Sequence, residues 1–356
     1  MGKNLIPVSV ITGFLGSGKT TLLAQLLRDP ALSRTAVIIN EFGAVGLDHE
    51  LVETSDESFV QLSNGCLCCN VRSDLVLTLG DLAARRAAGT VPQFERVVVE
   101  TTGLADPAPI LHALMTDRAL CELYALDGVI TTVDAVAGLA TLDNHAESLR
   151  QAAVADRLVL TKTDVPQAQT VALRARLARI NPGASLLAAV NGALSPSALF
   201  DCGPYNAANK HADVQSWLAH EGAAPHGHAA HQHSDEITSF CVVRDKPLHA
   251  VTLALLLSAL AENCGADLLR VKGIVQVVEE PDQPAVIHGV QHVYHAPVWL
   301  ERWPSADRRT RMVFIGRNIR ESWVRNLIDL LDAEVADEIS RRRTAATSRP
   351  PEIISG

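Results

Sequence analysis

Short runs of aliphatic and β-branched residues alternate with amphipathic stretches through the first 200 residues. The apolar runs are nearly continuous, which is typical of strands buried on both faces of a parallel sheet. Alternating strands and helices require crossover connections, so we expect residues 1–203 to form a doubly wound, mostly parallel α/β domain. The pattern predicts strands at Val8–Thr12, Ala36–Ile39, Arg96–Val99, Val129–Val133, Arg157–Leu160 and Leu186–Val190, and helices at Thr20–Leu27, Asp74–Arg86, Ala146–Ala155 and Ala168–Ile180.

The pattern changes after residue 203. Residues 204–235 are polar, and we interpret this segment as a linker. It contains four closely spaced histidines: His226, His228, His231 and His233. These imidazoles could capture metal weakly, or the linker could simply be solvated. Residues 236–335 predict a smaller, mostly antiparallel α+β domain. Its expected strands are Ile237–Val243, Leu268–Glu279, Ala285–Tyr294 and Arg311–Ile315, and its helices are Leu248–Asn263 and Glu321–Leu331. Residues 336–356 are expected to form a disordered tail.

Composition narrows the class of protein. The formal net charge of −9 over 356 residues argues against nucleic acid or an anionic membrane as the main partner. Seven cysteines, an odd number in a chain of this size, are a poor match to a secreted disulfide framework. The first apolar stretch runs directly into a glycine-rich motif, unlike a signal peptide, and the run Val251–Leu260 is too short to span a bilayer. We therefore predict a reduced, cytoplasmic protein.

The segment Gly13–Thr20 matches the phosphate-loop pattern GxxxxGKT and lies between a predicted strand and a predicted helix, which is the context the motif requires. In such a loop, successive backbone N–H groups and the helix N-terminus surround the phosphates. Lys19 would place its charge at the β- and γ-phosphates, and the Thr20 hydroxyl would bind Mg²⁺. The predicted phosphate-binding residues are Gly13, Gly16, Ser17, Gly18, Lys19, Thr20 and Thr21.

Two further carboxylates follow predicted strands of this domain. Glu100 ends the strand that begins at Arg96 and can reach a hydrated Mg²⁺, while the N–H of the nearby Gly103 could sense the γ-phosphate. Glu41 follows the strand Ala36–Ile39 and could face Mg²⁺ or a second metal, or be an ordinary loop carboxylate. The expected catalytic residues are Lys19, Thr20, Glu41 and Glu100.

The segment Thr161–Asp164 follows another strand, where guanine-binding proteins place an Asn/Thr-Lys-x-Asp element. Asp164 can accept two hydrogen bonds from guanine but would be badly paired against adenine, so it favours GTP over ATP. Lys162 would lie along the base, beside Thr161. Asn191 could also approach the base, although Asn-Gly is a common turn.

Three cysteines occur within four residues: Cys66, Cys68 and Cys69. Thiolates suit Zn²⁺ and other soft-accepting ions. Structural zinc sites usually close with four protein ligands, so a site with three could keep a position open for transfer. A redox pair or packed thiols are the alternatives that the residues leave open.

Together these motifs resemble the CobW-type metallochaperone GTPases, which include the zinc-regulated GTPase metalloprotein activators. The resemblance spans about residues 5–335. It implies GTP hydrolysis, Mg²⁺, a metal at Cys66-Leu67-Cys68-Cys69, commonly Zn²⁺ and in some members Co²⁺, and delivery of that metal to a client metalloprotein. Thr161 stands where many GTPases have Asn, and no arginine finger is identifiable.

We therefore predict a P-loop GTPase in which nucleotide state and metal binding are coupled. A zinc buffer or sensor with a structural nucleotide is one alternative, and an ATP-dependent small-molecule kinase is another. Neither nucleic acid nor a membrane is an expected partner. The sequence leaves open which client receives the metal, and whether the chain forms a homo-oligomer.

Overall fold

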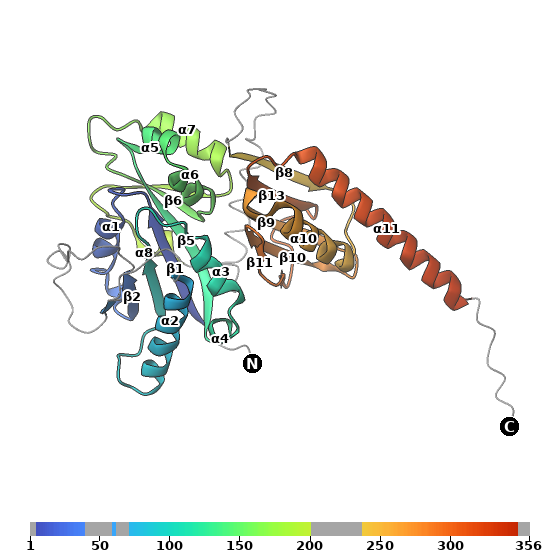
Figure 1. The fold of residues 1–356 in the computed structure, drawn as a ribbon, viewed down its shortest axis with the longest axis horizontal. Helices are drawn as coiled ribbons and strands as arrows, with labels where there is room; N and C mark the ends of the chain where they lie inside the picture. The colour runs from blue at the N-terminus through green and yellow to red at the C-terminus, as the bar shows by residue number, and fades with distance from the viewer. Residues whose placement is uncertain (1–4, 40–58, 62–70, 201–236, 348–356) are drawn as a thin grey trace.

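A computed structural model describes residues 5–39, 59–61, 71–200 and 237–347. The chain forms two α/β bodies that lie side by side, each built around one sheet (Figure 1). The first carries the phosphate-loop motif, and the second is the carboxyl-terminal body.

The first sheet has seven strands, all parallel, in the order β3-β2-β4-β1-β5-β6-β7. The strands are β1 (Ile6–Gly13), β2 (Thr35–Ile39), β3 (Phe59–Gln61), β4 (Arg96–Glu100), β5 (Tyr124–Asp134), β6 (Arg157–Thr161) and β7 (Ser185–Ala189). After β3 at one edge, the chain returns to β4 beside β1 and then continues with β5 on the other side of β1. The carboxyl ends of β1, β4 and β5 therefore meet where the strand order reverses, which is where ligands bind in such sheets. The predicted doubly wound α/β fold is confirmed.

Helices cover both faces of this sheet. On one face, α1 (Lys19–Leu26) and α8 (Pro196–Leu199) pack against alternate residues of the central strands, with Leu22, Ile130 and Val159 in one core. On the other face, alternate residues such as Val97 and Leu158 pack against two groups of helices. These are α2 (Val71–Ala87), α3 (Ala108–Thr116) and α4 (Arg118–Cys121), and then α5 (Gly138–Asn144), α6 (Ala146–Ala153) and α7 (Thr170–Ile180).

The second sheet is antiparallel and has the order β11-β10-β9-β13-β8, with β12 paired to β10. Its strands are β8 (Thr238–Arg244), β9 (Leu268–Val277), β10 (Glu280–Val290), β11 (Val293–Tyr294), β12 (Val298–Trp299) and β13 (Thr310–Gly316). One face is covered by α10 (Ala250–Cys264) and α11 (Glu321–Thr347). The strand predicted at Ala285–Tyr294 is a hairpin instead, because the chain turns at Gln291, where φ is 54°.

The prediction of a disordered tail is wrong for residues 336–347, because these residues continue α11. Alanine and arginine, both good helix formers, fill this stretch, and Glu338 pairs with Arg342 one turn later. The first helix-breaking residue is Pro350. In Figure 1 this end of α11 extends away from the first body.

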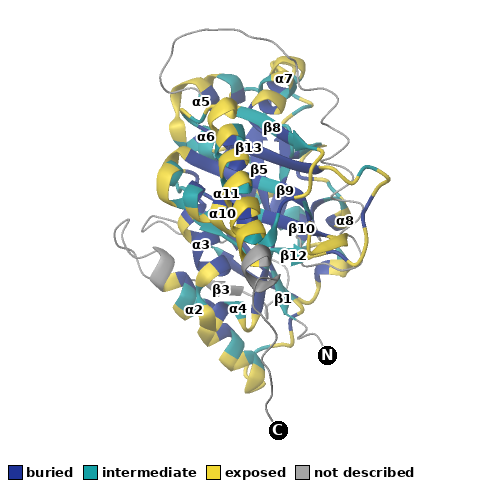
Figure 2. Ribbon diagram, turned by 90° about the vertical axis from the view of Figure 1, so that its right-hand side faces the viewer, coloured by how far each residue is buried: buried dark blue, intermediate teal, exposed yellow. Residues whose placement is uncertain are grey.

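The other face of the second sheet packs against the first body. Ile274, Val286 and Val313 of the second sheet share one buried core with Leu142 and Leu158 of the first. In Figure 2 the strands of both sheets are largely buried, and the outer sides of α7 and α11 are exposed. The two bodies are therefore joined by a continuous apolar interface.

Among the described residues, one 18-residue window, Ala250–Asp267, is long and apolar enough to cross a membrane by length and composition alone. It coincides with α10, whose Leu253, Leu256 and Leu260 are buried in the core of the second body. The helix therefore already has a packing partner within the protein.

An ion cluster lies within the interface between the two bodies. Asp156, between α6 and β6, contacts Arg270 and Lys272 of β9, and the Oδ1–NH2 distance to Arg270 is 2.7 Å. Burial opposes ionisation of Asp156, but the two cations outweigh it and hold the pKa of its carboxyl far below the ordinary value. The same burial lowers the pKa of Lys272.

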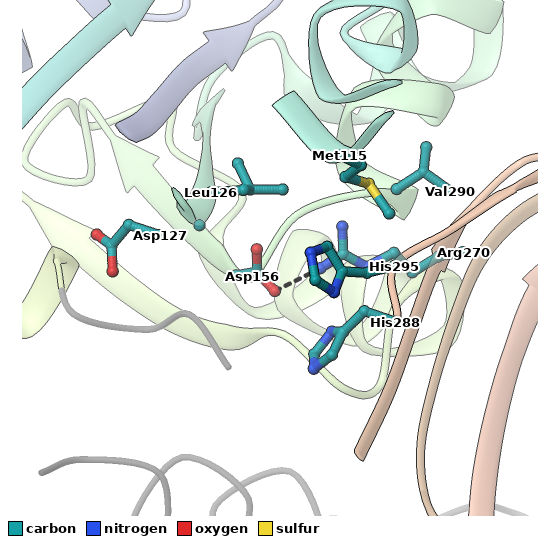
Figure 3. A pocket seen from close by; sticks show the side chains of 9 residues that line it. Met115, Leu126, Asp127, Asp156, Arg270, His288, Val290 and His295 are labelled. Atoms are coloured by element: carbon teal, nitrogen blue, oxygen red, sulfur yellow. Dashed lines mark hydrogen bonds and ion pairs between the residues drawn. The ribbon is translucent and has the colours of Figure 1, made fainter. Parts of the chain in front are cut away.

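A small pocket opens beside this cluster, with His288 and His295 pointing into it (Figure 3). Its volume of about 20 Å³ has room for about one water molecule, so it is too small for a metabolite. Burial and the neighbouring Lys272 and Arg270 cations hold the pKa of His288 well below its ordinary value.

Candidate functional site

The phosphate loop connects β1 directly to α1, and its shape depends on its glycines. Gly13, Gly16 and Gly18 all have positive φ, at 141°, 70° and 90°. A Cβ at Gly13 would lie 2.4 Å from Thr132 Oγ1, so no larger residue fits there without displacing β5. The loop therefore has the tight backbone path that phosphate binding requires.

Lys19 and Thr20 stand at the start of α1, as the motif predicts. Lys19 is 8% exposed, and its Nζ donates to the carbonyl of Gly13 at 3.0 Å, so the ammonium group lies over the loop. The Thr20 hydroxyl donates to Glu100 Oε1 at 2.8 Å. Strands β1 and β4 are neighbours, with Ile11 opposite Glu100, and this pairing brings the two motifs together.

The hydroxyl of Thr20 and the carboxylate of Glu100 form a pair of hard oxygen donors at the phosphate loop. Mg²⁺ prefers such ligands and is usually held by one or two protein oxygens together with the substrate phosphates. The residues present therefore fit a magnesium ion that binds with a nucleotide.

Gly103 lies against the phosphate loop itself. A Cβ built on it would come within 2.6 Å of Leu15 N, so the backbones of the two loops are in close contact. The carbonyl of Gly103 accepts a hydrogen bond from Gln151 Nε2 at 3.2 Å. Gly103 thus lies against the phosphate loop, and a contact of its N–H with a γ-phosphate stays a prediction.

Thr161, predicted to contact the base, supports the phosphate loop through its side chain. Its hydroxyl donates to the carbonyl of Ser17 at 2.8 Å, and its methyl group lies 3.3 Å from where a Gly18 Cβ would be. The Ser17 hydroxyl is in turn 2.7 Å from Thr132 Oγ1. A direct contact of Thr161 with the base stays a prediction.

Lys162 extends across the phosphate loop from a left-handed backbone conformation, with φ at 55°. Its Nζ donates to the carbonyl of Gly16 at 2.9 Å and to Asp134 Oδ2 at 2.6 Å. Burial alone would raise the pKa of Asp134, but hydrogen bonds from Lys162 and from two backbone N–H groups outweigh it and lower the pKa. Asp164 is exposed on the same loop.

The predicted turn after β7 approaches the start of α1. Asn191 has φ 51° and is exposed, and a Cβ at Gly192 would lie 2.8 Å from the carbonyl of Thr21. The turn therefore lies near the phosphate-loop helix. Whether the Asn191 side chain contacts a base stays a prediction.

Three contributors to this site carried no clear signal in the sequence. Thr132 and Asp134 are the polar end of the long buried strand β5, and that position at the strand's carboxyl end could have indicated them. Gln151 is a single glutamine in a short helix, and only the fold shows that its amide reaches the Gly103 loop.

Several predicted site residues lie outside the described residues. These are Glu41, Cys66, Cys68 and Cys69, together with the linker histidines. The cysteine motif falls in the sequence between Gln61, which ends β3, and Val71, which opens α2. Within the described part of the chain, no group of three or more His, Cys, Asp or Glu side chains could hold a metal ion.

A phosphate loop between β1 and α1, with an acid at the end of the adjacent strand and a Thr-Lys-x-Asp loop after β6, defines a P-loop nucleotide-binding protein. Two family models define the class of this protein more narrowly. Residues 7–188 match the CobW/HypB/UreG nucleotide-binding domain, and residues 237–331 match the cobalamin synthesis protein CobW C-terminal domain. The chain belongs to the CobW/HypB/UreG family.

Relatives match nearly the whole chain. The zinc chaperone YjiA of Escherichia coli is 34% identical over 325 residues, which cover 90% of this chain and 97% of that protein. The zinc chaperone CobW of a Sinorhizobium species is 30% identical over 365 residues, covering 92% and 97%. The crystal structure of Zn(II)-bound YjiA GTPase from E. coli superposes with a TM-score of 0.66 at 29% identity, covering 93% and 99%.

Proposed function

We propose that this protein is a GTPase that couples GTP binding and hydrolysis to the delivery of zinc to a client metalloprotein. The observation that carries the proposal is the meeting of Lys19, Thr20, Glu100 and Lys162 around one phosphate loop. This site lies in a chain that matches both family models and carries the Cys66-Leu67-Cys68-Cys69 motif.

The phosphate loop would bind the triphosphate through its backbone N–H groups, with Lys19 at the β- and γ-phosphates. Asp164 would accept hydrogen bonds from guanine, and Lys162 would lie along the base plane. Thr20 and Glu100 would hold Mg²⁺, which neutralises charge on the phosphates when it is bound.

Hydrolysis would use water as the nucleophile. Its oxygen attacks the γ-phosphorus, the bond to the β–γ bridging oxygen breaks, and GDP and phosphate leave as a water proton is released. Lys19 would stabilise charge on the bridging oxygen, and Glu41, which could face Mg²⁺ or the second metal, is a further proposed catalytic residue. With no arginine finger identified in the sequence, turnover of the isolated protein should be slow, about 10⁻⁴–10⁻² s⁻¹.

Zinc is the proposed cargo, held as the ion by thiolates of Cys66, Cys68 and Cys69, with cobalt as the alternative metal. The cysteine segment follows β3 in the sequence, and Gln61 at the end of β3 pairs with Ile39, which also pairs with Glu100. The cysteine segment thus follows a strand that lies two positions from β4 in the sheet, and this arrangement supports the proposed coupling between the two sites. The three described cysteines outside the motif, Cys121, Cys241 and Cys264, form no disulfide, which suits a reducing compartment such as the cytoplasm.

The proposal is tested by measuring zinc affinity with a competing chelator, once with GDP and once with a slowly hydrolysed GTP analogue. We expect the two affinities to differ by about 5–150-fold, corresponding to a coupling of ~1–3 kcal/mol. Cys66→Ala should lose tight zinc binding and keep GTP binding, and Lys19→Ala should do the reverse. Cys121→Ala, which removes a free thiol elsewhere, is the matched control.

Equal zinc affinity with both nucleotides would refute the coupling. Preference for ATP over GTP would instead favour the small-molecule kinase. Tight zinc binding with no effect of a client on hydrolysis would favour the zinc buffer or sensor.

A further inference from the structure

Helix α6 and its flanking residues contact the phosphate loop, the loop after β4 and the second body. At its N-terminal end, the ring of His145 stacks on Phe14 of the phosphate loop, with 4.5 Å between ring centroids. The helix therefore begins in contact with the loop that would hold the phosphates.

The middle of α6 holds the loop after β4. Gln151 is fully buried, and its Nε2 donates to the carbonyls of Gly103 at 3.2 Å and Ala105 at 3.0 Å. One residue earlier, Arg150 pairs with Asp106 of the same loop at 3.3 Å. A buried amide is costly unless it is hydrogen-bonded, so these contacts fix the position of the loop relative to the helix.

The backbone of α6 is itself tied to the sheet. The carbonyl of Gln151 accepts a hydrogen bond from Thr131 of β5 at 2.8 Å, and Asn181 Nδ2 donates to the carbonyls of Ala152, Ala153 and Ala155. These hydrogen bonds join the helix of eight residues to β5 and to the end of α7, so a displacement of the helix would have to strain or break them.

The C-terminal end of α6 reaches the second body. Ala152 and Ala153 lie in the core that both bodies share, and Asp156 follows directly. Asp156 contacts Arg270 and Lys272 of β9 in the ion cluster. Burial of this cluster makes separation of the charges costly, so β9 must follow any displacement of Asp156 or lose the contact.

We propose that α6 transmits the state of the nucleotide site to the second body, with Gln151 as the positioning residue that links the Gly103 loop to the helix. This inference rests on the proposed function, since it requires that GTP and GDP bind at the phosphate loop. A γ-phosphate that moves Gly103 displaces Gln151, and α6 passes the displacement to Asp156 and β9. Close-packed cores transmit such small shifts because they do not deform continuously. The carboxyl-terminal body is then the part of the protein whose presentation to a client depends on the nucleotide.

The test is amide hydrogen exchange of the full-length protein, followed by mass spectrometry, with GDP and with a slowly hydrolysed GTP analogue. In the wild type, we expect exchange of β9 peptides (residues 268–277) to differ by about fivefold or more between the two nucleotides, the lower end of typical coupling. Gln151→Leu should abolish this difference, measured at concentrations of the GTP analogue that saturate the variant.

Gln93→Leu is the matched control, because the Gln93 amide also donates to a carbonyl, that of Arg86 at 2.8 Å, but on an exposed loop away from the phosphate loop. It should keep the wild-type response. Lys272→Met tests the far end of the path while keeping the Arg270–Asp156 pair. It should reduce the β9 response, because one of the two contacts of Asp156 with β9 is lost, and it provides this test even if Gln151→Leu does not fold.

The inference is overturned if β9 exchange is the same with both nucleotides in a wild type that binds them, and this result leaves the proposed function standing. It is also overturned if Gln151→Leu or Lys272→Met keeps the full response. Failure of the wild type to bind GTP would remove the proposed function and this inference together.

Discussion

Replacing Asp156 by Asn tests how strongly the two bodies are held together. Asn has nearly the same shape and keeps an oxygen that can accept the Val129 N–H, which now donates to Asp156 Oδ2 at 2.8 Å. The charge facing Arg270 and Lys272 is lost. The side chains of Asp156, Arg270 and Lys272 are 7%, 6% and 13% exposed, so water cannot replace the missing carboxylate. Breaking a buried ion pair in this way costs about 3–5 kcal/mol.

Urea unfolding followed by tryptophan fluorescence measures this loss, since Trp303 lies in the shared core. The expected loss is a large fraction of a typical unfolding free energy of about 5–15 kcal/mol. Adding Lys272→Met to Asp156→Asn should recover about 1 kcal/mol or more, because it removes one of the two stranded cations. Glu95→Gln is the control: Glu95 pairs with Arg34 on the surface, where both are more than half exposed, and the change should cost under about 1 kcal/mol.

A loss below about 1 kcal/mol for Asp156→Asn would refute this reasoning, because it would mean that the two cations remain solvated or find another partner. A further loss on adding Lys272→Met would also contradict it. That result would show that Lys272 stabilises the interface through its methylene packing rather than through Asp156.

Three further changes test the nucleotide site and the interface. Thr161→Val removes the hydrogen bond to the phosphate loop at constant shape and should weaken GTP binding about 5–10-fold by calorimetry, whereas Thr161→Ser should not. Gly103→Ala forces the phosphate loop to shift and should weaken GTP binding at least about tenfold, while Gly80→Ala, with open space around it, should not. The pKa of His288 is lowered in the folded protein, so below pH ~6.5 the unfolded chain binds more protons than the folded protein does. The unfolding free energy should therefore fall by up to ~1.4 kcal/mol per pH unit on acidification. In unfolding titrations at several pH values, His288→Asn should flatten this slope.

Most of the first body could be predicted because its strands are buried on both faces and read as continuous apolar runs. The strand β3 could not, since three residues give too short a pattern, and α3 begins at Ala108 beside two prolines that suggest a loop. The first part of α11 was predicted as Glu321–Leu331. Its outer half was missed because it buries little and depends on helix propensity and ion pairs rather than on an apolar stripe.

The phosphate loop was predictable residue by residue, because chemistry fixes its glycines, Lys19 and Thr20 at set spacing. The parts contributed by distant strands were not. Asp134 and Gln151 act through contacts that span 28 and 48 residues of sequence, and only the pairing of strands and the position of α6 bring them to the loop. Thr161 is a further case: its spacing indicated a base contact, which stays a prediction, but did not indicate the hydrogen bond from its hydroxyl to the phosphate loop.

The shared core also limits how the chain can be divided. A fragment ending at Phe200 would expose Leu142, Leu158 and their neighbours to water and leave Asp156 without its cations. Such a fragment should aggregate or unfold unless its apolar face is redesigned, so exchanging carboxyl-terminal halves between relatives requires matching that face as well as the ion cluster. Recombination between family members would therefore have to preserve both sides of the interface between the two bodies together.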